Sequence, residues 1–220
     1  MYIAIEGAIG VGKTTLARLL QPIFKAKLFL EVFEENPFLA NFYGDRERYA
    51  FQTQIFFLLS RYHQQKDVVK QLKMVDNLIA DYTFDKDSLF ACLNLDGDEL
   101  ETYYQVHHAL AERIPPPDLI VYLQADTNVL MQRIALRDRP YERDMDRNYI
   151  DELNNTYETY FDEIYNGSPV LPIDTNQLNY VSNREDLKSV ENRIRQALEL
   201  PPFQKELPLD MKERGKAIRR

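Results

Sequence analysis

The chain has 220 residues with a formal charge of −8 at pH 7, and 45% of its residues are hydrophobic. This length suits one α/β domain, and the negative charge argues against nucleic-acid polymers and anionic membrane surfaces as partners, because both bind a net basic face. The single cysteine, Cys92, excludes an internal disulfide, and because no charged leader or long apolar segment precedes the first expected strand, we expect a cytoplasmic protein.

Strand and helix patterns alternate along the first half of the chain. Short apolar runs predict strands at residues 2–6, 27–31 and 77–82, and helical periodicity predicts helices at 13–24 and 46–72. The longer helix is rich in Phe, Ile, Leu and Tyr side chains, most of which we expect in the core.

The second half of the chain continues this alternation. We expect strands at 119–123 and 170–173 and helices at 98–113, 126–137, 148–166 and 183–198. Five strands joined by helical crossovers predict an α/β fold with a parallel, doubly wound sheet. Ligands of such sheets bind at the carboxyl ends of the strands, so the side chains that follow each strand are the first candidates for function.

The last twenty residues differ in composition from the rest. They hold six Lys or Arg against three Asp or Glu, and Pro201, Pro202 and Pro208 make them a poor helix. We therefore expect one domain over residues 1–200 and a basic C-terminal extension over residues 201–220.

A phosphate-binding motif follows the first expected strand and matches the pattern G-x-x-x-x-G-K-[ST] at every fixed position. With the next residue, the expected nucleotide-binding loop comprises Gly7, Ala8, Ile9, Gly10, Val11, Gly12, Lys13, Thr14 and Thr15. Glycines let the backbone turn its N–H groups toward phosphates, the lysine adds a positive charge, and the threonine hydroxyl offers a ligand to Mg²⁺. The alternative is a glycine-rich turn that binds nothing.

Acidic residues stand at the ends of the first three expected strands, at Glu6, Glu31 and Asp81. Glu31 is a candidate general base for an attacking hydroxyl, and the alternative is a solvated acid at a strand end. Asp81 ends a buried apolar strand, where proteins with this loop place a carboxylate that holds Mg²⁺ directly or through water. A structural role for Asp81 is equally open.

Five arginines fall between residues 133 and 147, which is typical of a solvated surface. The segment 137–140 also interrupts the expected helix, so Arg133, Arg137 and Arg139 are alternatively the arginines of a mobile lid that neutralises a transferring phosphoryl group.

Gln54 and Arg61 lie seven residues apart and share one face of the long helix. A nucleobase edge would satisfy this buried amide, although a structural hydrogen bond to backbone is as common. The three histidines, His63, His107 and His108, lack metal-ligand spacing, and we expect them on exposed helix surfaces.

In order and spacing, these residues together resemble the deoxynucleoside kinase family, in particular its bacterial deoxyadenosine, deoxyguanosine and deoxycytidine kinases. The resemblance runs from Met1 to about Leu198. Its most specific stretches are residues 31–43, 51–61 and 133–142. It implies a P-loop kinase fold with an arginine-rich lid, ATP and Mg²⁺ as cofactors, a deoxynucleoside as substrate, and a homodimer.

The resemblance also implies roles for single residues. Lys13 and Thr14 would serve the ATP phosphates and Mg²⁺, and Glu31 would deprotonate the 5′-hydroxyl of the sugar. The remaining positions are Tyr43 and Glu142 for the 3′-hydroxyl, Gln54, Arg61 and Asp87 for the base, and Arg133, Arg137 and Arg139 for the lid. An Arg61–Asp87 pair beside Gln54 would present acceptors to an exocyclic amine, which favours purine or cytosine bases over thymine.

Two positions depart from the family pattern. The family usually has Pro after the catalytic Glu, where this chain has Val32 and Phe33. It also has Arg where this chain has Tyr82, and a tyrosine does not supply the charge that would support the base and the reacting oxygen. We expect slower catalysis, a shifted substrate, or partial rescue by a lid arginine.

Two other functions remain open from the sequence. A nucleoside monophosphate kinase of the thymidylate type has a similar first strand and loop, but its ionised acceptor favours an arginine near the position of Glu31. A nucleotide-binding regulatory subunit that has lost catalysis is the second alternative, because of Tyr82.

Overall fold

In the part of the chain that the structure describes, five parallel strands form one sheet in the order β2-β3-β1-β4-β5. The computed structural model describes residues 1–32, 36–111 and 114–202. The strands are β1 (Tyr2–Glu6), β2 (Lys27–Phe29), β3 (Leu78–Ala80), β4 (Leu119–Gln124) and β5 (Val170–Asp174). This confirms the predicted α/β fold with a parallel, doubly wound sheet.

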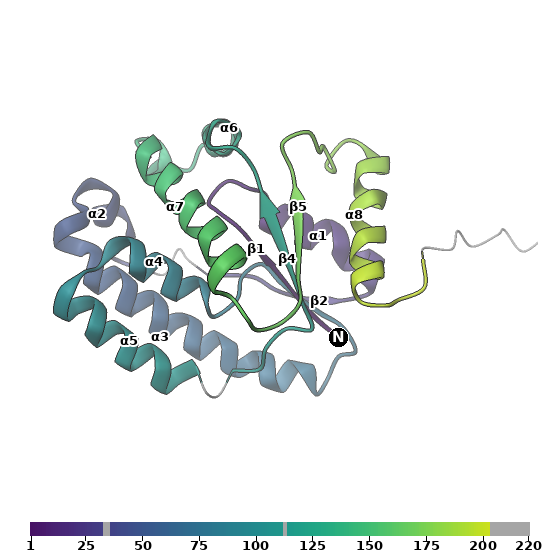
Figure 1. Cartoon of the computed structure of the whole chain (residues 1–220), viewed down its shortest axis with the longest axis horizontal. Coiled ribbons are helices and arrows are strands. Elements are labelled where there is room, and N and C mark those ends of the chain that lie inside the picture. Colours follow the sequence, from purple (N-terminus) through teal and green to yellow (C-terminus); the bar gives the residue numbers. More distant parts are fainter. Residues whose placement is uncertain (33–35, 112–113, 203–220) are drawn as a thin grey trace, which may run out of the picture.

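Helices cover both sides of the sheet. They are α1 (Lys13–Phe24), α2 (Leu39–Gly44), α3 (Arg46–Leu72), α4 (Lys86–Asn94), α5 (Gly97–Ala111), α6 (Thr127–Arg137), α7 (Arg147–Thr159) and α8 (Arg184–Ala197). In Figure 1, α1 and α8 lie to the right of the strands, whereas α2 to α5 and α7 lie to the left. A 3₁₀ turn (Pro140–Glu142) follows α6, and a π-helical turn (Tyr160–Ile164) extends α7.

The central strand β1 pairs with β3 on one side and β4 on the other. All five of its residues are buried, as expected for an apolar run covered by helices on both faces. Since β1 leads directly into the nucleotide-binding loop, this loop lies at the carboxyl edge of the sheet, beside the ends of β3 and β4.

Two strands are shorter than predicted. β2 ends at Phe29 and β3 spans only Leu78–Ala80, because the last pair of their register joins Phe29 to Ala80. The expected extensions to residues 31 and 82 were therefore wrong, and Glu31 lies in the loop that follows the strand. Helices α2 and α4 were not predicted. Both helices are short, with six and nine residues, and such short segments show little helical periodicity.

The prediction that all three histidines are exposed was wrong for His107. The residue is 6% exposed, and its ring stacks on Phe84, with ring centroids 4.9 Å apart, and on Tyr103 at 5.9 Å. Burial lowers its pKa to about 4, helped by the neighbouring His108. His63 and His108 are exposed, as expected.

Only residues 201 and 202 of the expected C-terminal extension lie in the described part of the chain, and both are exposed and outside helices. Residues 203–220 lie outside the described residues, so the domain boundary stays a prediction. Within the described ranges, no helix is both long and apolar enough to cross a membrane.

Candidate active site

A cavity of about 910 Å³ opens at the carboxyl edge of the sheet. Its lining includes the nucleotide-binding loop from Ile9 to Thr15 at one end and Gln54 and Arg61 of α3 at the other. Most of the predicted site residues line it. The three that do not are Gly7, Ala8 and Asp87, and each contacts Lys13 or Arg61 of the lining. The fold thus brings the predicted phosphate and base residues into one space.

Gly7 and Gly12 show why the backbone of the loop depends on glycine. Gly7 has φ +140° and a Cβ there would clash with the carbonyl oxygen of Leu123 in β4. Gly12 has φ +105°, forms the N-cap of α1, and lies under the Tyr180 hydroxyl. Both conformations are rare for residues with a Cβ, which explains the motif.

Lys13 closes the loop on itself. Its Nζ donates hydrogen bonds to the carbonyl oxygens of Gly7 at 2.7 Å and Ala8 at 3.0 Å. Burial lowers the pKa of Lys13 to about 8, and the ammonium group of Lys86 adds to this effect. The ammonium therefore lies at the loop and is poised to gain a phosphate partner.

Asp81 connects the loop to the segment of Glu31. Its Oδ2 accepts a hydrogen bond from the Thr14 hydroxyl at 2.5 Å, and its Oδ1 accepts one from the Glu31 N–H at 2.8 Å. A hydroxyl and a carboxylate at the phosphate end of the cavity are the hard oxygen ligands that Mg²⁺ uses with substrate phosphates. The described residues contain no group of three or more His, Cys, Asp or Glu residues arranged to hold a metal by themselves.

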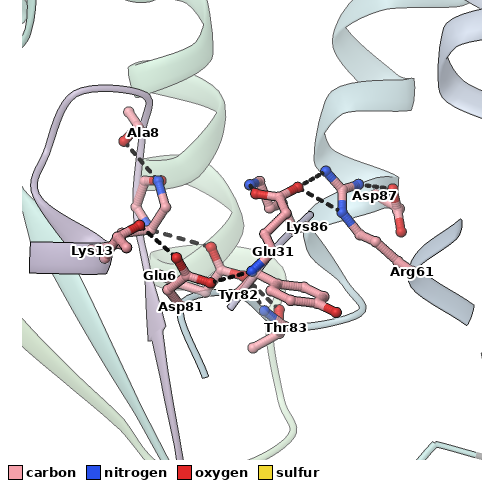
Figure 2. A network of polar contacts seen from close by, with 12 residues as sticks. Glu6, Ala8, Lys13, Glu31, Arg61, Asp81, Tyr82, Thr83, Lys86 and Asp87 are labelled. Atoms are coloured by element: carbon pink, nitrogen blue, oxygen red, sulfur yellow. Dashed lines mark hydrogen bonds and ion pairs between the residues drawn. The ribbon is translucent and has the colours of Figure 1, made fainter. Parts of the chain in front are cut away.

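Glu31 is held by two cations. Arg61 donates from Nε to Oε1 at 2.9 Å and also from Nη2, and Lys86 donates from Nζ to Oε2 at 2.5 Å (Figure 2). Burial alone would raise the pKa of Glu31, but Arg61 and Lys86 outweigh it and hold the pKa well below its usual range. Glu31 is therefore an oriented carboxylate in the cavity wall, and the alternative of a solvated acid was wrong. Phe33, one of the two departures beside it, lies outside the described residues.

Two acceptors without partners lie at the Arg61 end of the cavity, one in its lining and one directly behind Arg61. Arg61 also donates from Nη1 to Oδ1 of Asp87, which confirms the predicted pair. In the described part of the chain, neither Oδ2 of Asp87 nor Oε1 of Gln54 has a hydrogen-bond partner, although both are buried. Buried acceptors of this kind indicate a ligand that donates hydrogen bonds.

The predicted sugar residues come together across α2 and the 3₁₀ turn. Glu142 is 5% exposed, and Arg137 donates to it from Nη2 at 2.6 Å and 2.7 Å and from Nε at 3.1 Å. Tyr43 stacks on Tyr141 with ring centroids 6.3 Å apart. Burial raises the pKa of Tyr43, and the nearby charge of Glu142 contributes to this.

The three arginines expected in a lid contact the walls of the site. Arg133 donates to the carbonyl oxygen of Val11 at 3.2 Å and to Thr175 at 2.7 Å and 2.9 Å. Arg137 and Arg139 both pair with Glu142, the latter at 3.6 Å. Their guanidinium groups thus lie at the cavity, but their movement as a lid remains a prediction.

Two parts of the cavity lining were not predicted from the sequence. Lys86 pairs with Glu31, but a lone lysine before Asp87 carries no recognisable pattern. The stretch 176–181 lines the cavity beside the loop, and it contains neither motif nor periodicity. Glu6, by contrast, is fully buried and accepts hydrogen bonds from Gly7, Thr83 and Tyr157, so its role is structural.

Comparisons with known proteins agree with this geometry. The family model of deoxynucleoside kinases matches residues 3–199. The chain is 34% identical over 201 residues to a deoxyguanosine kinase of Bacillus subtilis (strain 168), covering 90% of this chain and 97% of that protein. It is 36% identical over 177 residues to a deoxyadenosine kinase of Dictyostelium discoideum, covering 78% of this chain and 71% of that protein. A solved structure of deoxyadenosine kinase from M. mycoides with the products dCMP and dCDP has a TM-score of 0.75 and 28% identity to this chain. The match covers 89% of this chain and 100% of that one.

Proposed function

Because the chain belongs to the deoxynucleoside kinase family, we propose that it transfers the γ-phosphoryl group of ATP to the 5′-hydroxyl of a 2′-deoxynucleoside. The observation that carries this proposal is the position of Glu31, fixed in one cavity between the phosphate loop and the base-binding residues. Membership of this family argues against the two alternatives, a thymidylate-type kinase and a regulatory subunit, because the matched proteins are kinases of deoxynucleosides.

Glu31 is the proposed acceptor of the 5′-hydroxyl proton. A bond forms between the 5′-oxygen and the γ-phosphorus, the bond from that phosphorus to the β,γ-bridging oxygen breaks, and ADP leaves. The low pKa of Glu31 keeps the carboxylate ionised at neutral pH. Since most of the acceleration in phosphoryl transfer comes from positioning and charge neutralisation, its main task is to orient the hydroxyl.

Lys13 and the backbone of the loop are proposed to hold the triphosphate, with Arg133 beside the loop and Arg137 and Arg139 paired with Glu142. Thr14 and Asp81 would hold Mg²⁺, which neutralises phosphate charge when it is bound. The hydrogen bond between these two side chains supports the assignment, because it places both oxygens at the phosphate end of the cavity.

Gln54, Arg61 and Asp87 are proposed to bind a base that carries an exocyclic amine. The support is the pair of unpartnered acceptors, Gln54 Oε1 and Asp87 Oδ2, because a purine or cytosine amine donates to such atoms. Thymine would present a carbonyl and a methyl group instead. Tyr43 and Glu142 are proposed to bind the 3′-hydroxyl. We also propose that the chain forms a homodimer.

Glu31→Gln tests the function. The amide keeps the shape of the side chain and loses its basicity, so we expect turnover to fall by about 100-fold or more while the affinity for the deoxynucleoside changes by less than about fivefold. The measurement is ADP release with ATP and a panel of four deoxynucleosides, together with calorimetric binding of the best one. Lys70→Gln on the exposed face of α3 is the control and should match wild type.

Two outcomes would contradict these proposals. Equal turnover in wild type and Glu31→Gln would remove Glu31 from the mechanism. Phosphorylation of thymidine far above deoxyadenosine, deoxyguanosine and deoxycytidine would refute the proposed base preference while leaving the kinase reaction in place.

A further inference from the structure

We propose that Lys86 is a positioning residue for Glu31, and that it supplies from α4 the positive charge that Tyr82 lacks. This inference rests on the proposed function, because it gives Glu31 its task as acceptor of the hydroxyl proton. The geometry that carries it is the contact of Lys86 Nζ with Glu31 Oε2 at 2.5 Å, opposite the contacts of Arg61 with Oε1.

The location of Lys86 is unfavourable for stability in two ways. Lys86 is only 6% exposed, and lysine is rarely buried unless it is paired. It is also the first residue of α4, where the helix dipole disfavours a cation. The Glu31 carboxylate compensates both penalties. A lysine that is buried, lies at a helix start and faces the site has a role in the site rather than in the stability of the fold.

Lys86 lies on the phosphate side of Glu31. Figure 2 shows its ammonium group on the side of the carboxylate that faces Lys13, whereas Arg61 and Asp87 lie on the other side. The electrostatic effect of Lys86 on Lys13 agrees with this placement. A 5′-hydroxyl bound to Glu31 between the base and the triphosphate would therefore have Lys86 close to the developing negative charge.

Tyr82 does not compete for this role. It is fully buried, its ring stacks on Phe29 with centroids 5.8 Å apart, and its hydroxyl donates to Gln64 Oε1 at 3.0 Å. The side chain thus belongs to the packing between β2, β3 and α3. Partial rescue by a lid arginine was one of the three expected consequences of Tyr82, but Arg133 contacts the phosphate loop, and Arg137 and Arg139 pair with Glu142. Of the described cations, Arg61 and Lys86 contact Glu31.

Lys86→Gln and Lys86→Arg separate this role from simple packing. For Lys86→Gln we expect kcat to fall by about 30-fold with KM for the deoxynucleoside within about threefold, because the change acts on the aligned carboxylate rather than on binding. Lys86→Arg keeps the charge and should recover to within about fivefold of wild type.

A double-mutant cycle tests whether Lys86 acts through Glu31. In the Glu31→Gln background, Lys86→Gln should cost less than about threefold in single-turnover rate. The double variant also lacks both halves of the buried ion pair, so it provides a folded comparison if Lys86→Gln alone unfolds. An additional loss as large as in wild type would overturn the proposal, as would an unchanged kcat in Lys86→Gln.

The wild-type measurement separates this inference from the proposed function. Absence of deoxynucleoside-dependent ADP release from wild type would refute the function itself. Wild-type turnover with an unaffected Lys86→Gln variant would refute only the role of Lys86. Lys70→Gln, an exposed lysine change on α3, controls for the loss of one positive charge and should leave all of these parameters unchanged.

Discussion

Lys13 illustrates how a single side chain is prepared for its ligand. In the free protein its ammonium group is bound to two loop carbonyls, and burial together with Lys86 lowers its pKa to about 8. A phosphate chain adds negative charge beside it and raises that pKa again. Nucleotide binding and protonation of Lys13 are therefore coupled.

This coupling predicts a pH dependence of nucleotide affinity. Above pH 8 the free protein has a neutral Lys13, so binding of ADP must take up a proton, and the affinity should fall by about tenfold between pH 8 and pH 9.5. Calorimetry in buffers of different ionisation enthalpy measures both the affinity and the proton. Lys13→Arg stays charged and should show a flat profile over this range, so parallel profiles for the two proteins would contradict the prediction.

Helix α5 shows what burial of a titratable ring does to an element. His107 is a buried histidine of α5 that stacks on Phe84, just before α4, and on Tyr103 of its own helix. The folded pKa of His107 is about 4, whereas the ordinary value in an unfolded chain is 6.5. Between these two pH values the ring is neutral in the native protein, but it binds a proton in the unfolded chain. Stability contributed by this site is therefore complete above pH 6.5 and is lost as the pH falls toward 4.

We expect wild type to lose about 2 kcal/mol more unfolding free energy than His107→Phe between pH 7 and pH 5. Phenylalanine keeps the ring and its stacking but binds no proton, so the comparison isolates the titration. Urea unfolding at the two pH values provides the measurement. If both proteins lose the same free energy, His107 is not the group responsible.

Elements with strong local signals were predictable and elements without them were not. The apolar run before the glycine loop predicted β1 because it is buried on both faces. Glu31 and Asp81 were recognised as site residues because they follow such runs. Helix α4 was missed because it spans only nine residues, and with it Lys86, whose importance depends on a partner 55 residues away. Long-range pairs of this kind leave no local pattern.

Across the whole molecule, Glu6 connects the layers at the edge of the sheet. Its carboxylate accepts hydrogen bonds from the Gly7 N–H at 3.2 Å, from the Thr83 N–H and hydroxyl at 2.5 and 2.8 Å, and from the Tyr157 hydroxyl at 3.2 Å. These groups belong to the phosphate loop, the segment after β3, and α7. The sequence placed Glu6 at a strand end, but its partners are known only from the fold.

Replacing this carboxylate should affect the entire fold. Glu6→Gln places an amide NH₂ group among donors, so we expect the unfolding free energy to fall by about 3 kcal/mol. Tyr157→Phe removes a single hydrogen bond of the same network and should cost about 1 kcal/mol. Chemical denaturation at pH 7 measures both. A loss in Glu6→Gln no greater than in Tyr157→Phe would show that the network is not cooperative.

The guanidinium group of Arg61 is shared, since one edge contacts Glu31 and another contacts Asp87. Under the roles proposed for Glu31 and Asp87, the choice of base and the speed of the reaction are therefore not independent. Redesign of Asp87 to admit an unnatural nucleoside would also release one anchor of the group that aims Glu31. Variants selected for a broader substrate range should therefore be slow until a second substitution restores that anchor.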